Sequence, residues 1–88
     1  KTILSMDGIN PETGLTTYHA EEAVLNRAMM ERSGETIIVA DQSKIGYESF
    51  SFVSPLSAAA CLVTNGHSDT TSKIRELEEA GLRVIRVT

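Results

Sequence analysis

Short apolar runs along the chain predict strands. Residues 36–40 read TIIVA, a continuous β-branched run typical of a strand buried on both faces of a parallel sheet. Residues 1–6, 61–64 (CLVT) and 83–87 (RVIRV) contain similar short apolar runs. Four strands are therefore expected, separated by longer segments of a different character.

Two of the separating segments predict helices. Residues 19–32 are rich in good helix formers, with glutamates in the first turn and an arginine in the last, which suits the helix dipole. Residues 71–80 form the second predicted helix, with Ile74 and Leu77 facing inward and Gly81 ending it. In the first helix, one broad apolar face is predicted to belong to the core: Val24, Leu25, Ala28 and Met29.

The remaining segments predict loops and turns. Residues 7–18 are rich in Gly, Pro, Asn and Thr and predict a long loop, and residues 41–46 predict a polar loop. Residues 47–53 fit either irregular structure or a short edge strand, and residues 55–60 fit a helical turn. A turn is expected at Asn65-Gly66.

The resulting order, β, loop, α, β, loop, β, α, β, predicts an α/β fold with a mostly parallel sheet and flanking helices. A parallel sheet needs cover on both faces, and two helices do not cover both faces of four strands. We therefore expect residues 1–88 to be part of a larger domain, or to pack against a partner.

Composition narrows the function further. The chain has 88 residues, 41% of them hydrophobic, and a net charge of −4, which fits one globular domain and argues against direct contact with DNA. No apolar run approaches the roughly 20 residues that span a bilayer. Cys61 is alone, so an internal disulfide is excluded, and we expect it to be buried and inert in a cytoplasmic protein. His19 and His67 share no metal-ligand spacing with it, so no metal site is expected.

The polar loop after the second strand has the parts of an anion site. Ligands of open parallel sheets bind at the carboxyl ends of the strands, where this loop is expected. Ser43 offers a hydroxyl, Lys44 a positive charge, and Gly46 close approach of the backbone. The alternative is a solvated turn with a surface lysine, because neither GxxxxGK[ST] nor GxGxxG occurs.

Two carboxylates are further candidates. Asp7, after the first strand, fits an acceptor for a sugar hydroxyl or a general base, or simply a turn aspartate that bonds its own backbone. Glu22 could face a pocket at the start of the first helix, or only favour the helix dipole.

Taken together, several segments resemble one family. They are SMDGINPETGLT (5–16), EEAVLNRAMM (21–30), IIVADQSKIG (37–46), SFVSPLS (51–57) and CLVTN (61–65). Their succession resembles the C-terminal effector domain of DeoR-family bacterial transcription regulators, and covers nearly all of the chain. The 88 residues resemble the second half of that domain.

The resemblance implies a fold similar to the ribose-5-phosphate isomerase, glucosamine-6-phosphate deaminase and CoA-transferase group. It implies a sensor, without cofactor or catalysis, that binds a phosphorylated sugar or sugar alcohol as effector. Such proteins are usually repressors that form homo-oligomers and contact operator DNA only through an N-terminal helix-turn-helix domain. That domain and the first half of the sensor domain are absent from residues 1–88.

The resemblance also implies which residues bind the effector. Lys44 matches a lysine that meets substrate phosphate in the related isomerases, and Gly14 matches a turn of the family. The ligand-binding residues implied are Asp7, Gly8, Thr16, Glu22, Arg27, Asp41, Ser43, Lys44 and Gly46.

The chain also departs from the family pattern at five positions, where it has Asn10, Asn26, Gln42, Ile45 and Asn65. Asn10 and Asn65 stand where many members have aspartate. An amide at position 10 cannot act as a general base, which argues against catalysis. Two alternatives remain: an enzyme resembling sugar-phosphate isomerases or deaminases, or a segment that mainly supplies an oligomerisation surface.

Overall fold

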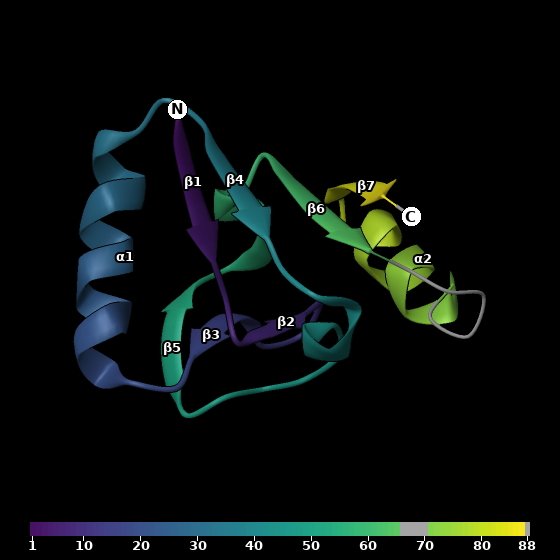
Figure 1. Cartoon of the computed structure of the whole chain (residues 1–88), viewed down its shortest axis with the longest axis horizontal. Coiled ribbons are helices and arrows are strands. Elements are labelled where there is room, and N and C mark those ends of the chain that lie inside the picture. Colours follow the sequence, from purple (N-terminus) through teal and green to yellow (C-terminus); the bar gives the residue numbers. More distant parts are fainter. Residues whose placement is uncertain (66–70, 88) are drawn as a thin grey trace.

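A computed structural model describes residues 1–65 and 71–87 of the chain (Figure 1). Its elements are, in order, β1 (Thr2–Ser5), β2 (Gly8–Asn10), β3 (Gly14–Thr17), α1 (Ala20–Arg32), β4 (Thr36–Val39), η1 (Gln42–Lys44), β5 (Ser51–Ser54), η2 (Leu56–Ala58), β6 (Cys61–Asn65), α2 (Thr71–Glu79) and β7 (Arg83–Val87). The turn expected at Asn65-Gly66 and the predicted position of His67 lie outside the described residues.

The four predicted strands form one parallel sheet, in the order β1-β4-β6-β7. Leu4 of β1 pairs with Ile38 of β4, which pairs in turn with Leu62 of β6. These side chains point to the same face and form the centre of the core. The expectation of an α/β fold with a mostly parallel sheet and flanking helices is confirmed.

The expectation of a long loop over residues 7–18 is wrong. This segment contains β2 and β3, which form an antiparallel sheet with β5 and lie below the ends of β1 and β4 in Figure 1. Ile9 and Leu15 are directly opposite each other and fully buried, so the hairpin is held by core packing. Strands of three and four residues are too short for alternation to be visible in the sequence.

The prediction of a buried apolar face on α1 is also wrong. Ala23 is the residue of this helix that is buried, and the exposed fractions of Val24 and Leu25 are 60% and 61%. Met29 is 39% exposed, and Ala28 is exposed as well. The residues that face inward are those about 100° to 180° around the helix from the predicted stripe. By contrast, α2 packs as predicted, with Ile74 and Leu77 in the core.

The parallel sheet is covered on one face. Val39 is 44% exposed and Ile3 is 67% exposed, although TIIVA was expected to be buried on both sides. Alternation places both side chains on the face opposite Leu4 and Ile38. The expectation that two helices do not cover this sheet is confirmed. Cys61 is buried as expected, and no helix in the described ranges has the length and apolarity to cross a membrane.

Candidate functional site

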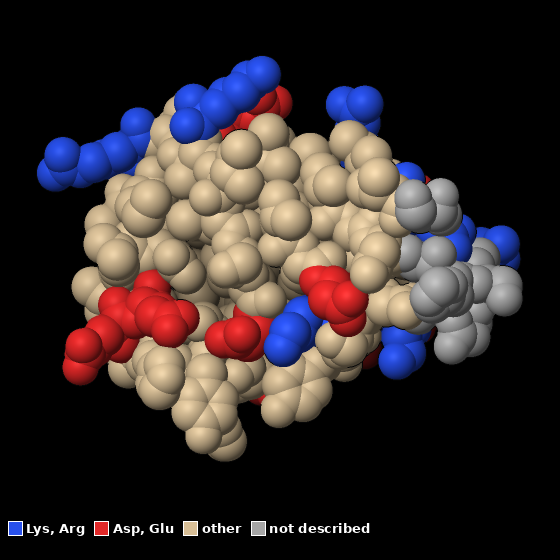
Figure 2. All heavy atoms as spheres, in the orientation of Figure 1, with Lys and Arg blue, Asp and Glu red and all other residues tan. Residues whose placement is uncertain are grey.

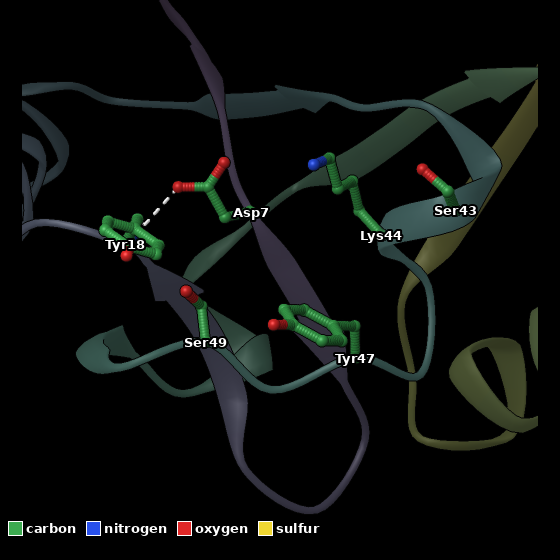
Figure 3. Close-up of a pocket in the computed structure, with 6 residues that line it drawn as sticks. All are labelled: Asp7, Tyr18, Ser43, Lys44, Tyr47 and Ser49. Carbon is green, nitrogen blue, oxygen red and sulfur yellow. Dashed lines mark hydrogen bonds between the residues drawn. The ribbon is translucent and has the colours of Figure 1, made fainter.

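A hollow of about 380 Å³ lies where the parallel sheet meets the small antiparallel sheet. Figure 3 shows side chains from three places pointing toward it: the end of β1, the end of β3, and the segment from η1 onward. The residues that line it are Asp7, Tyr18, Ser43, Lys44, Tyr47 and Ser49. It therefore lies beyond the carboxyl ends of β1 and β4, as expected for an open parallel sheet.

Asp7 is held firmly at one side of this hollow. Its Oδ2 accepts hydrogen bonds from the Tyr18 backbone N–H at 2.8 Å and the Thr17 hydroxyl at 2.9 Å (Figure 3 shows the former). The Tyr18 amide lowers the pKa of Asp7 below its usual value. The Thr17 hydroxyl and the charge of Lys44 also lower this pKa, whereas burial raises it. The carboxylate is ionised at neutral pH, and its Oδ1 has no hydrogen-bond partner among the described residues.

Glu22 is linked to Asp7 through Thr17. The Thr17 hydroxyl lies 3.1 Å from Glu22 Oε2, and Thr17 itself is 1% exposed. A hydroxyl has one proton to donate, so the two carboxylates compete for it. Glu22 lines a separate hollow at the start of α1, and thus supports the site from the side.

The loop 41–46 presents Ser43 and Lys44. Asp41 caps the η1 turn, and the Ser43 N–H donates to its Oδ2 at 2.9 Å. This amide, with the Ser43 hydroxyl and Asn65, lowers the pKa of Asp41 to about 2. Both Asp41 oxygens accept hydrogen bonds from within the protein, so this residue shapes the loop. In Figure 3 the half-buried Lys44 extends its ammonium group toward the side of the hollow where Asp7 lies.

Two asparagines hold the ends of this loop. Asn65 Nδ2 donates to Asp41 Oδ1 at 3.0 Å, and its Oδ1 accepts from the Gln42 N–H at 2.9 Å. At the other end, Asn10 Nδ2 donates to the Gly46 carbonyl at 3.2 Å. An aspartate side chain in ionised form has no proton for either donation. These two departures from the family pattern thus fit the contacts that this chain makes.

Thr16 and Gly8 position the segment opposite the loop. The buried Thr16 hydroxyl accepts a hydrogen bond from the Ser49 N–H at 2.9 Å. Gly8 leaves no room for a Cβ, which would overlap Thr16 Oγ1 and lie 2.5 Å from the Tyr47 carbonyl oxygen. Both residues therefore fix the backbone that carries Tyr47 and Ser49.

Arg27 lies elsewhere. Its Nη1 donates to the Phe52 carbonyl at 2.6 Å, which joins α1 to β5 beside a different hollow. Gly14 and Gly46 adopt φ of +85° and +84°, which favour glycine, and the Gly46 N–H bonds the Ile9 carbonyl at 2.7 Å.

Among the implied ligand residues, the structure thus brings Asp7, Ser43 and Lys44 to one hollow. Gly8, Thr16, Asp41 and Gly46 belong to the segments that carry its lining, whereas Glu22 and Arg27 line other hollows. Tyr18, Tyr47 and Ser49 were missed by the sequence reasoning. The two tyrosines, both more than half exposed, directly follow β3 and Gly46. The sequence feature that could have identified the two tyrosines is an aromatic residue beside a polar loop at the end of a strand. Within the described ranges, no three His, Cys, Asp or Glu side chains gather as a metal ion would require.

Asn65→Asp tests whether this amide positions the Lys44 loop. In the parent protein, Asn65 Nδ2 donates to Asp41 Oδ1 at 3.0 Å. An aspartate at position 65 would place a carboxylate oxygen where this donor stands, and the two carboxylates would repel each other. We expect binding of a phosphorylated ligand to weaken several-fold relative to the parent protein at pH 7.5. The ratio of the two affinities should move toward one as the pH falls from 7.5 to 5, because the repulsion between the two carboxylates raises the pKa of one of them. Titration calorimetry at both pH values measures this ratio.

Asn65→Ala is the matched control for charge. It removes the same two hydrogen bonds without adding a carboxylate, so its affinity ratio to the parent protein should be the same at both pH values. A ratio for Asn65→Asp that does not change with pH would contradict the role given to the Asn65–Asp41 contact.

Comparison with known proteins identifies the family. Residues 1–66 match the family described as the DeoR C terminal sensor domain. The chain is 34% identical over 87 residues to an uncharacterized HTH-type transcriptional regulator, YulB, of Bacillus subtilis, covering 99% of this chain and 33% of that protein. It is 34% identical over 82 residues to the HTH-type transcriptional regulator GlpR of Haloferax volcanii, covering 93% and 32% respectively.

A third relative, the HTH-type transcriptional repressor GlcR of Bacillus subtilis, is 32% identical over 65 residues, or 74% of this chain and 25% of that protein. The chain thus spans about a third of the length of the curated relatives it matches. The family match covers most of the chain and the relatives agree with it, so this chain belongs to the DeoR C-terminal sensor domain family.

Proposed function

We propose that this chain is part of the effector-sensing domain of a transcriptional regulator of sugar metabolism, and that it binds a phosphorylated sugar or sugar alcohol. The observation that carries the proposal is that a positive and a negative group, Lys44 and Asp7, face one hollow. A sugar phosphate has the complementary pair, a dianion at one end and hydroxyl donors along the rest.

Each end of such a ligand has suitable partners. The Lys44 ammonium and the Ser43 hydroxyl would bind the phosphate, since both donate hydrogen bonds to an anion. Asp7 Oδ1 would accept a sugar hydroxyl. The rings of Tyr18 and Tyr47 offer apolar faces to the C–H side of the ligand. A hollow of about 380 Å³ has the size of small-molecule sites.

The environment of Asp7 favours binding over proton transfer. A general base works best with a pKa near the operating pH, whereas the Tyr18 amide lowers the pKa of Asp7 away from it. We therefore expect a sensor without enzymatic activity, and the similarity to proteins named as transcriptional regulators supports this expectation. The net charge of −4 argues against contact between this segment and DNA. We therefore expect a separate helix-turn-helix domain to contact operator DNA, and we expect the regulator to be cytoplasmic.

Ligand binding would then change operator affinity by population shift. The effector binds one arrangement of the regulator more tightly and so moves the equilibrium toward it. We also expect the regulator to be a homo-oligomer, with residues 1–88 forming the second half of each sensor domain.

A panel of phosphorylated sugars and sugar alcohols in a thermal-shift assay tests the proposal, with the unphosphorylated parent compounds as controls. A ligand at about 100 times its dissociation constant adds roughly 2.7 kcal/mol to the free energy of unfolding. We expect one phosphorylated compound to raise the melting temperature by several degrees, and its parent compound to leave it unchanged. A panel without any shift, or with equal shifts for both forms, would contradict the proposal.

The pH dependence of binding follows from the ligand and Asp7 together. The phosphate loses its second negative charge below about pH 6. Asp7 stays ionised through that range, because its folded-state pKa lies below the usual value. Affinity should therefore be constant above about pH 7 and fall toward pH 5, as measured by calorimetry. A phosphonate analogue with a higher second pKa should shift this fall to higher pH, whereas an unshifted profile would point to a protein group.

A further inference from the structure

The hollow with Lys44 and Asp7 has a charged side and an aromatic side. Figure 3 shows the Asp7 carboxylate and the Lys44 ammonium group in its upper part and the rings of Tyr18 and Tyr47 below them. Figure 2 shows acidic and basic side chains side by side across the lower part of the molecule, with uncharged side chains below them. A ligand in this hollow therefore meets charges on one side and apolar ring faces on the other.

The aromatic side extends beyond the two tyrosines. The Tyr18 ring packs edge to face against the rings of Phe50 and His19, with centroid separations of 5.1 Å and 4.9 Å. These aromatic residues do not belong to the core, because Phe50 is 77% exposed, Tyr18 57% and Tyr47 53%. Exposed aromatic side chains that gather beside a polar pocket are typical of a binding surface.

The backbone ties each tyrosine to one of the charged groups. The Tyr18 N–H donates to Asp7 Oδ2 at 2.8 Å, and the Tyr47 N–H donates to the Lys44 carbonyl at 3.4 Å. The two sides of the hollow are therefore held next to each other by the same short segments of chain. A ligand that bridges Asp7 and Lys44 consequently lies beside both rings.

A sugar in its ring form has the same two-sided character. Its hydroxyls project around the rim, whereas C–H bonds gather on a face of the ring. The hydrogens of that face carry a small positive charge, which suits the negative face of an aromatic ring. An open-chain sugar alcohol has hydroxyls on every side and no lasting apolar face, and it loses more rotational freedom when it binds.

We infer that this site selects the ring form of a sugar phosphate over an open-chain sugar alcohol phosphate. Tyr18 and Tyr47 are the specificity-determining residues, and Phe50 positions the Tyr18 ring. The inference rests on the proposed function and narrows it, because that function admits both forms of ligand. The phosphate is left to Lys44 and Ser43, so phosphate binding and ring selection can fail separately.

Ring ethers test the selection, because a free sugar interconverts between open and closed forms and an ether does not. One matched pair is anhydroglucitol phosphate, with a six-membered ring, and glucitol phosphate. The other is anhydromannitol phosphate, with a five-membered ring, and mannitol phosphate. We expect at least one ring ether to bind the 88-residue chain about tenfold more tightly than its open-chain partner in titration calorimetry.

Tyrosine emission gives a second readout of the same contact. The chain has two tyrosines and no tryptophan, and both tyrosines line the hollow. We expect the bound ring ether to change this emission, and its open-chain partner to leave it nearly constant at equal occupancy. Tyr47→Leu should lower the ratio of ring-ether to open-chain affinity, whereas Tyr47→Phe keeps an aromatic face and should preserve this ratio.

Phe50→Ala tests the support of the Tyr18 ring. Phe50 contacts this ring but does not line the hollow, so the affinity ratio should fall about threefold while the open-chain affinity stays constant. Phe52→Ala is the matched control, because Phe52 is 53% exposed and lines a different hollow. Its affinity ratio should equal that of the parent protein. Circular dichroism checks that both variants are folded.

The outcomes separate this inference from the proposed function. Open-chain partners that bind as tightly as the ring ethers would overturn ring selection, while the proposed function would stand because a phosphorylated compound binds. Binding of none of the four compounds would also overturn it, and the panel of phosphorylated sugars then decides the proposed function separately. An unchanged affinity ratio in Phe50→Ala would overturn the positioning role of Phe50.

Discussion

Replacing Lys44 with alanine should lower the affinity for the phosphorylated effector about 10- to 100-fold. Lys44 Nζ points into the hollow and has no salt-bridge partner in residues 1–65 and 71–87, so its charge is available to a ligand. A hydrogen bond to a charged group contributes about 1.5–3 kcal/mol, which corresponds to this range of affinity. The free energy of unfolding without ligand should change little, because the side chain is only half-buried.

Titration calorimetry with the phosphorylated compound and its parent sugar makes the test specific. The affinity for the parent sugar is expected to be equally weak in both proteins, so the preference for the phosphorylated form should collapse in Lys44→Ala. Lys1→Ala is the matched control, because it removes one positive charge from an exposed residue that pairs with Glu35 at 3.6 Å. Equal affinities for Lys44→Ala and the parent protein would remove Lys44 from the site.

The parallel sheet could be predicted from the sequence because its strands have strong local signals. TIIVA and CLVT each contain an apolar run of three or more residues, and the structure forms β4 and β6 at these positions. The hairpin of β2 and β3 could not be predicted in this way. Its stability comes from Ile9 and Leu15 in a core built by distant segments, which overrides the turn-forming composition around them.

The apolar face of α1 was predicted to be buried, but the structure exposes it. Its spacing predicted a face buried in the core, but spacing alone does not say which side of a helix meets the core. Val24 and Leu25 face away from this chain's core and are exposed. The helix was predicted correctly, and its orientation was not, because the polar Arg27 and Asn26 lie closer to the inner side.

The candidate site was predictable where residues act through charge. Lys44 and Ser43 stand in a loop that was predicted at a strand end, and the structure places both at the hollow. Residues that position this loop through hydrogen bonds from distant parts of the chain could not be identified from the sequence. The amides of Asn10 and Asn65, for example, hold loop 41–46 through partners 36 and 24 positions away. Such contacts depend on the register of whole elements.

Gly8→Ala should be the most destabilising of the substitutions considered. The added Cβ would overlap Thr16 Oγ1 and lie 2.5 Å from the Tyr47 carbonyl oxygen and 3.1 Å from the Ser49 nitrogen. Backbone on one side and a buried hydroxyl on the other cannot both yield without breaking the Thr16–Ser49 hydrogen bond. Overpacking of this kind costs about 2–3 kcal/mol of unfolding free energy. For a domain of this size the melting temperature should fall by roughly 10–20 °C.

Gly34→Ala is the control that separates crowding from the general effect of replacing glycine. Gly34 is exposed, its φ is not positive, and a Cβ there meets nothing within 4 Å. Its free energy of unfolding should stay constant or rise by about 0.4–1 kcal/mol. Calorimetric melting of both variants gives the comparison, and a Gly8→Ala melting temperature within 3 °C of the parent protein would refute the predicted crowding.

The two principal substitutions should differ in a way that separates binding from positioning. Lys44→Ala removes a ligand contact and leaves the fold intact, so affinity falls at constant stability. Gly8→Ala touches no ligand, yet it displaces the backbone that carries Tyr47 and Ser49, so stability and affinity should fall together. If Gly8→Ala lost stability while its folded fraction kept full affinity, the segment after Gly46 would not contribute to the site.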